Sequence, residues 1–126
     1  MGANVTKQAA LLEFFSSFGI DAYPNTAVTD DAALPYLTYE VKSASFGGLP
    51  VPIIVKLYYY TDSEAIPSKK AEEISRFIGE EGAAIRCDDG LIMVYKGDPF
   101  CINLEDETDS TIKLRYINLV LKFYTF

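Results

Sequence analysis

The first apolar pattern along the chain has the spacing of a helix. Between Thr6 and Phe18, apolar side chains recur three and four residues apart and define one face, which contains Leu11, Leu12, Phe15 and Phe18. The hydroxyl of Thr6 can cap the start, and Gly19 can end the helix in the left-handed conformation. The pattern therefore predicts a helix over residues 6–18 with one buried face.

The same spacing returns between Pro67 and Ile78. The apolar positions of this segment that share a face are Ala71, Ile74, Phe77 and Ile78. Pro67 suits the first turn, where no backbone amide is needed, and Gly79 can end the helix. We predict that residues 67–78 form the main helix and that Phe77 belongs to its buried face.

Alternating apolar and polar residues predict two strands between these helices. Residues 34–42 have the pattern of a half-buried strand, and residues 53–60 have that of a second. Pro50 and Pro52 confine the beginning of the second strand to a sheet edge or a loop. Residues 20–33 lack a sustained period, so we expect a loop or a short irregular strand there.

The last third of the chain predicts four strands in a meander. Asp89-Gly90 suits a type I′ hairpin turn, and the KGDPF segment at 96–100 is interpreted as a second turn. The last strand is apolar on both faces towards its end, as in a strand between a core and a neighbouring subunit. The predicted strands are 84–88, 91–95, 100–104 and 111–126.

This order of elements indicates an α+β fold. Strands that cluster after a helix, with tight turns between them, favour a mostly antiparallel sheet of about five to six strands, with a mixed sheet as the alternative. Two helices are expected to pack on one face of that sheet. The chain has 126 residues, of which 49% are hydrophobic, and this suits one domain over residues 1–126.

Charge and composition exclude several classes of function. The chain has 11 Lys and Arg, 18 Asp and Glu and no His, for a net charge of -7, which argues against nucleic acid as a direct partner. Without histidine, a Ser-His-Asp triad, a Cys-His dyad and an HExxH zinc site are impossible. Cys87 and Cys101 form no CxxC motif and are interpreted as buried reduced thiols. We expect no cofactor, no export signal and no membrane span.

Acidic residues offer two candidate metal sites, and both compete with simpler interpretations. Glu105, Asp106, Glu107 and Asp109 could bind a hard cation, but they lack the D-x-D-x-D-G spacing that converges on one ion, so a solvated loop is favoured.

Asp31, Glu40 and Lys42 resemble the acid-x-lysine strand of metal-dependent nucleases. Chance supplies about one such triplet in a chain of this composition, and an acidic protein repels a nucleic acid substrate. We therefore expect no metal site and no catalytic residue.

The order of motifs along residues 5–126 resembles the tail-terminator, or head-to-tail joining, proteins of long-tailed bacteriophages and prophages, also called minor capsid or tail-completion proteins. The segments that carry the resemblance are LPYLTYEV at 34–41, IIVKLYYYT at 53–61, KKAEEISRFIG at 69–79, DDGLIMVYKGDPF at 88–100 and TIKLRYINLVLKFYT at 111–125.

The resemblance implies a non-enzymatic assembly role. Subunits of such proteins close into a ring, typically sixfold, that ends the tail tube and docks to the head connector. The implied partners are further copies of the chain, a tail tube protein and a head connector protein. Genomic DNA only passes through, and acidic side chains would keep it from adhering. The implied location is the cytoplasm of a bacterial host during assembly and then the neck of the virion.

A closing ring needs two different contact surfaces on each subunit. Strands 53–60 and 117–126 are expected to supply one, and loop 42–52 the other. The residues expected at the subunit interface are Tyr58, Tyr60, Phe46, Leu49, Leu121, Phe123 and Phe126. The acidic residues at 105–109 are expected to face the lumen or a partner.

Three other functions remain open at this point. A head-closure or adaptor protein would dock on the portal instead of the tail tube. A metal-dependent nuclease would use Asp31, Glu40 and Lys42. An ordinary regulatory or small-ligand-binding domain has no pocket signature in the sequence.

Overall fold

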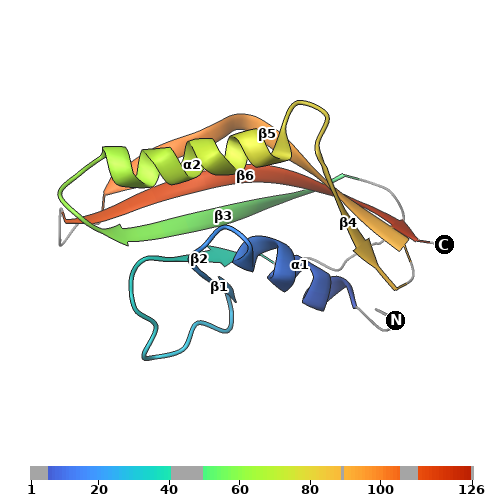
Figure 1. The fold of residues 1–126 in the computed structure, drawn as a ribbon, viewed down its shortest axis with the longest axis horizontal. Coiled ribbons are helices and arrows are strands. Elements are labelled where there is room, and N and C mark those ends of the chain that lie inside the picture. Colours follow the sequence, from blue (N-terminus) through green and yellow to red (C-terminus); the bar gives the residue numbers. More distant parts are fainter. Residues whose placement is uncertain (1–5, 41–49, 89, 106–110, 126) are drawn as a thin grey trace.

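The computed structural model describes residues 6–40, 50–88, 90–105 and 111–125. These residues contain two helices and six strands (Figure 1). In chain order the elements are α1 (Lys7–Ser16), β1 (Asp21–Pro24), β2 (Tyr36–Tyr39), β3 (Val51–Tyr60), α2 (Ala65–Ile78), β4 (Ala83–Cys87), β5 (Gly90–Glu105) and β6 (Ile112–Thr125).

The strands form one sheet in the order β1-β2-β3-β6-β5-β4. β1 pairs with β2 in parallel, and every other pairing is antiparallel. β6 lies at the centre, with β3 on one side and β5 on the other. The sheet curls, so that β1 at one edge and β4 at the other both contact α1 (Figure 1). This architecture confirms the predicted α+β class and its mostly antiparallel sheet.

Both helices pack on the same face of the sheet, which we call the covered face. Every second residue of β3 and β6 points to it, from Ile53 to Tyr59 and from Ile117 to Phe123. Phe15 of α1 stacks on Tyr39 of β2, with ring centroids 4.6 Å apart. The core therefore lies between the helices and one side of the sheet.

The first helix confirms its predicted N-cap but ends earlier than predicted, at Ser16 with Ser17 as its C-cap, and Leu12, which was expected on the buried face, is 41% exposed. Thr6 is the N-cap, and its Oγ1 accepts a hydrogen bond from the Ala9 amide at 3.1 Å. Gly19 has a φ of +86°, a conformation that side chains with a Cβ rarely adopt, and turns the chain towards β1. Phe18 is buried after the helix has ended.

The second helix starts at Ala65, before the predicted Pro67. Pro67 still lies in the first turn, where the backbone amides have no partner within the helix, so its missing N–H costs nothing. Phe77 was expected in the buried face, but 58% of its surface is exposed. Its ring packs edge-on against that of Phe18, just after α1, at 5.4 Å and lies 5.8 Å from that of Phe14 in α1, so it bridges the two helices at the surface.

The predicted turn at 96–100 is wrong, because β5 continues through it. The pairing of β5 with β6 shifts register between Lys96 and Cys101, which makes this segment a bulge. Gly97 permits the bulge, since a Cβ at that position would lie 2.9 Å from the Asn118 carbonyl oxygen. The Asn118 side-chain amide donates to the Pro99 carbonyl at 2.9 Å and holds the bulge closed. Three strands, β4 to β6, replace the four expected.

Smaller differences concern strand boundaries. Cys87 pairs with Gly90, so the β4–β5 connection consists of residues 88 and 89 instead of Asp89-Gly90, and residue 89 lies outside the described part of the chain. The segment expected to be a loop or a short irregular strand contains β1, which pairs with β2 from Asp21 opposite Tyr36. Cys87 and Cys101 are thiols, but each is half-buried and not fully buried as predicted.

Candidate functional site

The first half of β6 points its charged residues inward and its apolar residues outward. Lys113 and Arg115 share the phase of Ile117 along the strand, so they face the helices and are only 6% and 1% exposed. Leu114 and Tyr116 point to the opposite side. A strand that only covered a core would point its apolar residues inward and its charged residues outward. The first half of β6 has the opposite arrangement.

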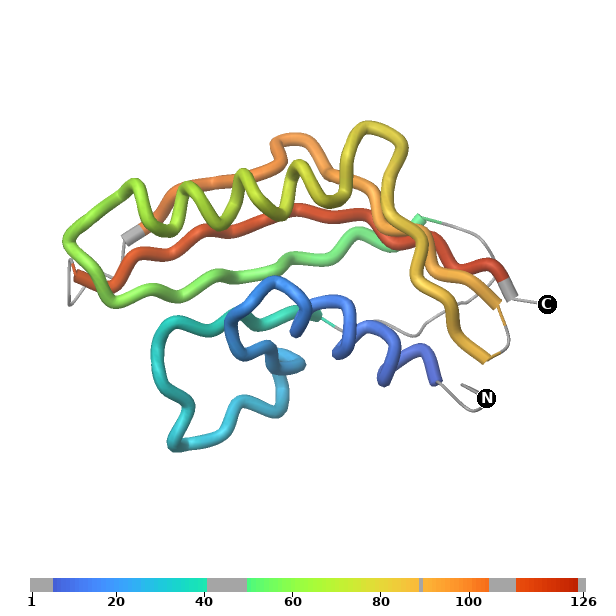
Figure 2. The backbone as a smooth tube through the Cα atoms, in the orientation of Figure 1, coloured from blue at the N-terminus to red at the C-terminus, as the bar shows by residue number. Residues whose placement is uncertain are grey.

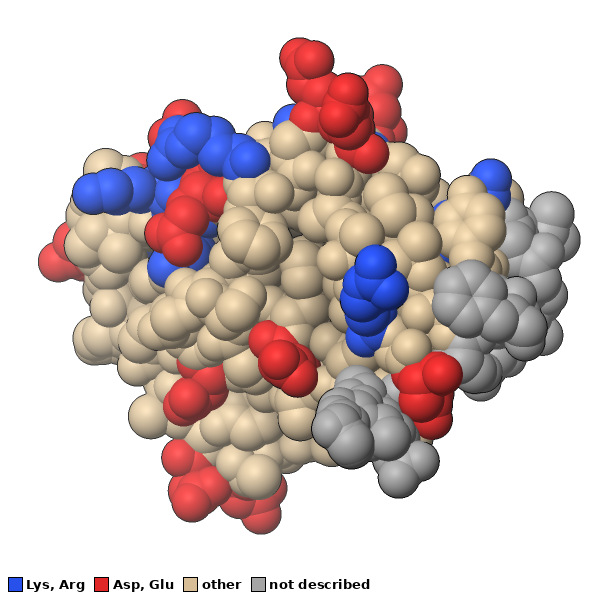
Figure 3. All heavy atoms as spheres, turned by 45° about the vertical axis from the view of Figure 1, so that its right-hand side comes forward, with Lys and Arg blue, Asp and Glu red and all other residues tan. Residues whose placement is uncertain are grey.

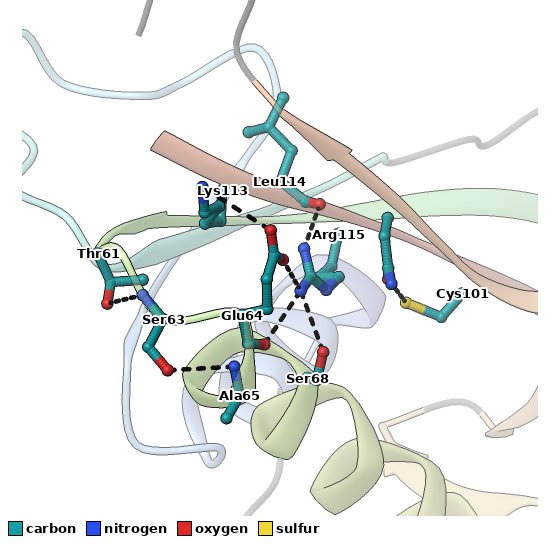
Figure 4. Close-up of polar contacts among 10 residues, drawn as sticks. Thr61, Ser63, Glu64, Ala65, Ser68, Cys101, Lys113, Leu114 and Arg115 are labelled. Carbon is teal, nitrogen blue, oxygen red and sulfur yellow. Dashed lines mark hydrogen bonds and ion pairs between the residues drawn. The ribbon is translucent and has the colours of Figure 1, made fainter. Parts of the chain in front are cut away.

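Arg115 is held by groups at the start of α2 (Figure 4). Its Nη2 donates to the Glu64 carboxylate at 2.7 Å, to the Glu64 carbonyl at 3.2 Å and to the Ser68 hydroxyl at 3.0 Å. Its Nη1 donates to the Leu114 carbonyl at 3.0 Å. Among the described residues, no acceptor contacts its Nε. The guanidinium therefore fastens the first turn of α2 to the centre of the sheet.

Glu64 is the exposed member of this ion pair. Its side chain is 56% exposed, and its second carboxylate oxygen lies 3.8 Å from the Lys113 ammonium. The hydrogen bond from Arg115 holds the pKa of Glu64 below its ordinary value, and the nearby positive charges add to this effect. The cluster has an anchoring role: one accessible carboxylate compensates two buried cations.

The opposite side of the sheet, which we call the open face, is covered by neither α1 nor α2, the two helices of the described residues (Figure 1). A row of tyrosines crosses three strands there. The Tyr23 and Tyr36 rings lie 5.6 Å apart, and those of Tyr36 and Tyr58 lie 5.0 Å apart. Burial raises the pKa of Tyr36, and the neighbouring Tyr58 and Tyr23 raise it further, so this hydroxyl stays neutral.

Apolar side chains continue the open face beyond the tyrosine row. Leu114 lies opposite both Tyr58 and Leu104, and Tyr116 lies opposite Ile102. Tyr60 is 67% exposed, Ile102 42% and Leu104 39%. The aromatic and aliphatic residues of the open face on these strands are Tyr36, Tyr58, Tyr60, Ile102, Leu104, Leu114 and Tyr116. Lys56 lies among them, with its Nζ 5.0 Å from the centroid of the Tyr116 ring. Aromatic and aliphatic side chains gathered on one face of a sheet are typical of a protein contact.

A second apolar surface lies on the helices. Leu12 of α1 is 41% exposed, and Ile66 and Phe77 of α2 are 51% and 58% exposed. Ile66 and Phe77 are eleven residues apart, which is close to three helical turns, so they lie on the same side of α2. Leu12 lies apart from them, because it lines a cavity with Pro24, Thr26 and Ala27. We call Ile66 and Phe77 the helix surface.

The residues predicted for a subunit interface divide into three groups. Tyr58 and Tyr60 lie on the open face, as the prediction requires. Leu121 and Phe123 lie in the core and are only 1% and 2% exposed, so their assignment to a subunit surface is wrong. Both belong to the inward phase of β6, which the two-sided apolar sequence concealed. The remaining candidates, Phe46, Leu49 and Phe126, lie outside the described residues.

The candidate metal ligands are only partly within the described residues. Glu105 ends β5, where its backbone is opposite Lys113, while Asp106, Glu107 and Asp109 lie outside. Over residues 6–40, 50–88, 90–105 and 111–125, no group of three or more Cys, Asp or Glu side chains is placed to hold a metal ion.

The nuclease candidates have different surroundings. Glu40 follows β2, and its carboxylate accepts a hydrogen bond from the Ile54 amide at 2.7 Å, so it extends the pairing between β2 and β3. Asp31 is exposed in the segment between β1 and β2, and Lys42 lies outside the described residues. The structure thus gives Glu40 a backbone partner and does not place it in a ligand cluster.

The surface charge visible in Figure 3 is dispersed. Asp and Glu side chains stand in several small, separate groups with uncharged surface between them. No helix in the described part of the chain is both long and apolar enough to cross a membrane. No known family model and no curated protein sequence matches the chain.

Proposed function

We propose that the chain is a non-enzymatic assembly subunit whose copies close into a ring at the head-proximal end of a phage tail tube and join it to the head connector. The observation that carries the proposal is the open face, where Tyr60, Ile102 and Leu104 are exposed and the neighbouring tyrosines and Leu114 are partly exposed. Covering such a face with protein removes apolar area from water, which is the main driving force of association.

The position of the two apolar surfaces favours a ring over a dimer. A two-fold dimer uses one surface twice, whereas a ring needs two different surfaces that contact each other head to tail. The open face is the side of the sheet opposite α2, whereas Ile66 and Phe77 belong to α2, which packs on the covered face. Packing the open face of one copy against the helix surface of the next would satisfy this requirement, and a sixfold ring is the expected closure.

The order of elements also supports the proposal. The resemblance to tail terminators rests on a helix, two strands, a second helix and a strand-rich end. That order is retained, although an additional strand, β1, follows the first helix and two of the expected strands are joined in β5.

Self-association of two charge-insertion variants tests the two-surface arrangement. Tyr60→Glu places a carboxylate on the open face, and Phe77→Glu places one on the helix surface. We expect each to remain monomeric where the unaltered chain associates, as measured by sedimentation velocity, because burying an unpaired charge is costly. Thr29→Glu, in the exposed segment after β1, adds the same charge elsewhere and is the matched control.

A mixture of the two variants distinguishes head-to-tail contact from two-fold contact. Each variant keeps the surface that the other lacks, so an equimolar mixture is expected to form a dimer and nothing larger. If Phe77→Glu dimerises by itself, the contact is two-fold and the ring proposal is wrong.

The site of assembly requires a test in the phage or prophage that encodes the chain. Particles without the protein are expected to show free heads beside overlong tails, and Tyr60→Glu is expected not to restore joining. Purified protein should bind tail tubes in a pull-down. Binding to the portal instead would assign the head-closure role, and full infectivity without the protein would overturn the proposal.

A further inference from the structure

The outer edge of β5 is unpaired over its second half. β4 pairs with β5 only from Gly90 to Val94, while β6 pairs with the other side of β5 as far as Glu105. From Tyr95 to Leu104, no strand among the described residues pairs with the outer edge of β5, which runs along the margin of the sheet beside α2 (Figure 2). This edge presents backbone donors and acceptors that another strand could use.

Other parts of the sheet margin have features that oppose pairing. β1 is only four residues long and contains Asp21 and Pro24. In β5 itself, the bulge between Lys96 and Cys101 contains Asp98 and Pro99. By contrast, residues 100–104 are Phe, Cys, Ile, Asn and Leu, without a charge or a proline. This segment of the edge can therefore accept a strand.

Two cavities lie beside this segment, between β5 and α2. The first has a volume of about 240 Å³ and is lined by Ser68, Ala71, Glu72, Ser75, Phe100, Cys101 and Asn103. The second has a volume of about 280 Å³ and is lined by Glu64, Ser68, Asn103, Leu104 and Arg115. They share Ser68 and Asn103, so they form one continuous groove along the edge.

The two cavities follow each other along the edge. Phe100 and Cys101 line the first, Leu104 lines the second and Asn103 lines both, and Cys101 and Asn103 face the helices. Positions i and i+2 of an extended chain are about 7 Å apart and point to the same side. A strand added beside residues 100–104 would thus place two alternate side chains in the two cavities.

The cavities differ in chemistry. Ala71, Phe100 and Cys101 make the first one mainly apolar, and burial raises the pKa of the Cys101 thiol, which keeps it neutral. The second contains the Ser68 hydroxyl and the Asn103 amide, with the Glu64 carboxylate at its rim. The first suits an aliphatic side chain, and the second suits a side chain that forms hydrogen bonds.

We propose that the β5 edge at Phe100–Leu104 receives an extended strand from a partner protein, with an aliphatic side chain in the first cavity and a hydroxyl or amide side chain, two residues along, in the second. Backbone hydrogen bonds to the edge would supply affinity, and the cavities would supply specificity. The site shares Ile102 and Leu104 with the open face, but the ring is tested at Tyr60 and Phe77, which lie outside the site, so each proposal can fail without the other.

Titration of the isotope-labelled full chain with synthetic peptides tests the proposal. The probes are capped heptapeptides of threonine with valine at the third position and serine at the fifth, and the same peptide with these two exchanged, because the edge does not fix the strand direction. At least one is expected to give saturable NMR shifts at the amides of residues 95–104 and of α2. Replacing its valine with aspartate is expected to abolish them.

N-methylation distinguishes strand addition from side-chain binding alone. In an added strand, alternate amides face the edge, so methylating one alternate set should weaken binding at least about fivefold, while methylating the other should not. Equal effects of both sets would overturn the proposal, as would the absence of saturable binding by either peptide.

A cavity-blocking variant supplies the protein control. Glu72→Phe should fill the mouth of the first cavity and weaken peptide binding, whereas Glu73→Phe alters an exposed α2 residue that lines neither cavity. Equal binding by both variants would overturn the proposal. If Glu72→Phe instead reduces self-association of the chain without any peptide, the occupant is a second copy, and the assignment to a different protein is wrong.

Discussion

The covered face and the open face of the same strands differ in which side chains they bury and which they leave in contact with water. On the covered face, β6 buries Arg115 at 1% exposure, and the start of α2 supplies a carboxylate, a carbonyl and a hydroxyl to hold it. On the open face, Tyr58 and Leu114 of neighbouring strands lie opposite each other with no helix above them. Inside, the buried guanidinium is held by acceptors for both of its terminal nitrogens, although its Nε has none among the described residues. Outside, apolar groups are retained with neither α1 nor α2 above them.

Under the proposed ring, this contrast separates folding from association. Packing of the helices on the covered face buries the core and determines whether the chain folds. The open face contributes little to the folding of a single chain, because its side chains remain partly in water. Substitutions on the two faces should therefore have effects on different measurements, and the following predictions are ordered from the largest effect to the smallest.

Neighbouring aromatic residues near the end of β6 provide the most direct test. Phe123 is 2% exposed on the covered face, and Tyr124 is 39% exposed on the open face. We expect Phe123→Ala to lower the free energy of unfolding by about 3–5 kcal/mol, because it leaves a cavity in the core. Tyr124→Ala should cost about 1 kcal/mol or less. Urea denaturation of monomeric samples measures both, and similar losses would contradict the separation of the two faces.

The bulge in β5 should be sensitive to a single added methyl group. In Gly97→Ala, the new Cβ would lie 2.9 Å from the Asn118 carbonyl oxygen, so backbone must move. We expect a loss of about 1–3 kcal/mol in the free energy of unfolding. Hydrogen exchange at residues 95–101 should locate the change. An unaltered stability would mean that the close approach of β5 and β6 at this point is not required.

The two members of the Glu64–Arg115 pair should respond unequally to removal. Glu64→Ala leaves a buried guanidinium without its counter-ion, whereas Arg115→Met leaves an exposed carboxylate that water can solvate. Glu64→Ala should therefore destabilise the subunit more than Arg115→Met does, as measured by thermal unfolding. The opposite order would show that the Arg115 side chain itself contributes more to stability than its ion pair with Glu64 does.

Glu64 also predicts a dependence of stability on acid pH. Its folded-state pKa is lowered from the ordinary 4.5, chiefly by the hydrogen bond from Arg115. The carboxylate thus contributes stability at pH values above the unfolded-state pKa, and the contribution is lost as pH falls through the folded-state pKa. The stability difference between the unaltered chain and Glu64→Gln should shrink on acidification. A difference that stays constant through this range would contradict the assignment.

Local patterns predicted the elements whose periods are unbroken. The helix over residues 6–18 and strand 53–60 followed from spacing alone, and Thr6 caps the first helix as expected. The bulge in β5 could not be predicted in this way. Gly97, Asp98 and Pro99 have the composition of a turn, and only the approach of Asn118 from β6, a contact distant in sequence, keeps the strand continuous.

The candidate site was partly predictable. Tyr58 and Tyr60 alternate with the buried residues of β3, so their side of the sheet followed from the sequence. Which side of β6 faces the core did not follow from the sequence, because its last residues are apolar on both faces and either side could have pointed inward. The one signal in the sequence is Arg115, which lies on the same side of β6 as Ile117 and Leu119. Its partner Glu64 is 51 residues away, and sequence periodicity contains no information on such a contact.

The central place of β6 has a consequence for how the chain acquires its structure. β1, β2 and β3 form one part of the sheet and β4 and β5 the other, and strand pairing joins these parts only through β6, which follows all of them in the chain. During synthesis the two parts cannot be united until this strand has been made. Folding of the whole sheet is therefore a late, single event, and a chaperone that shields the earlier strands would act before residue 112 is available.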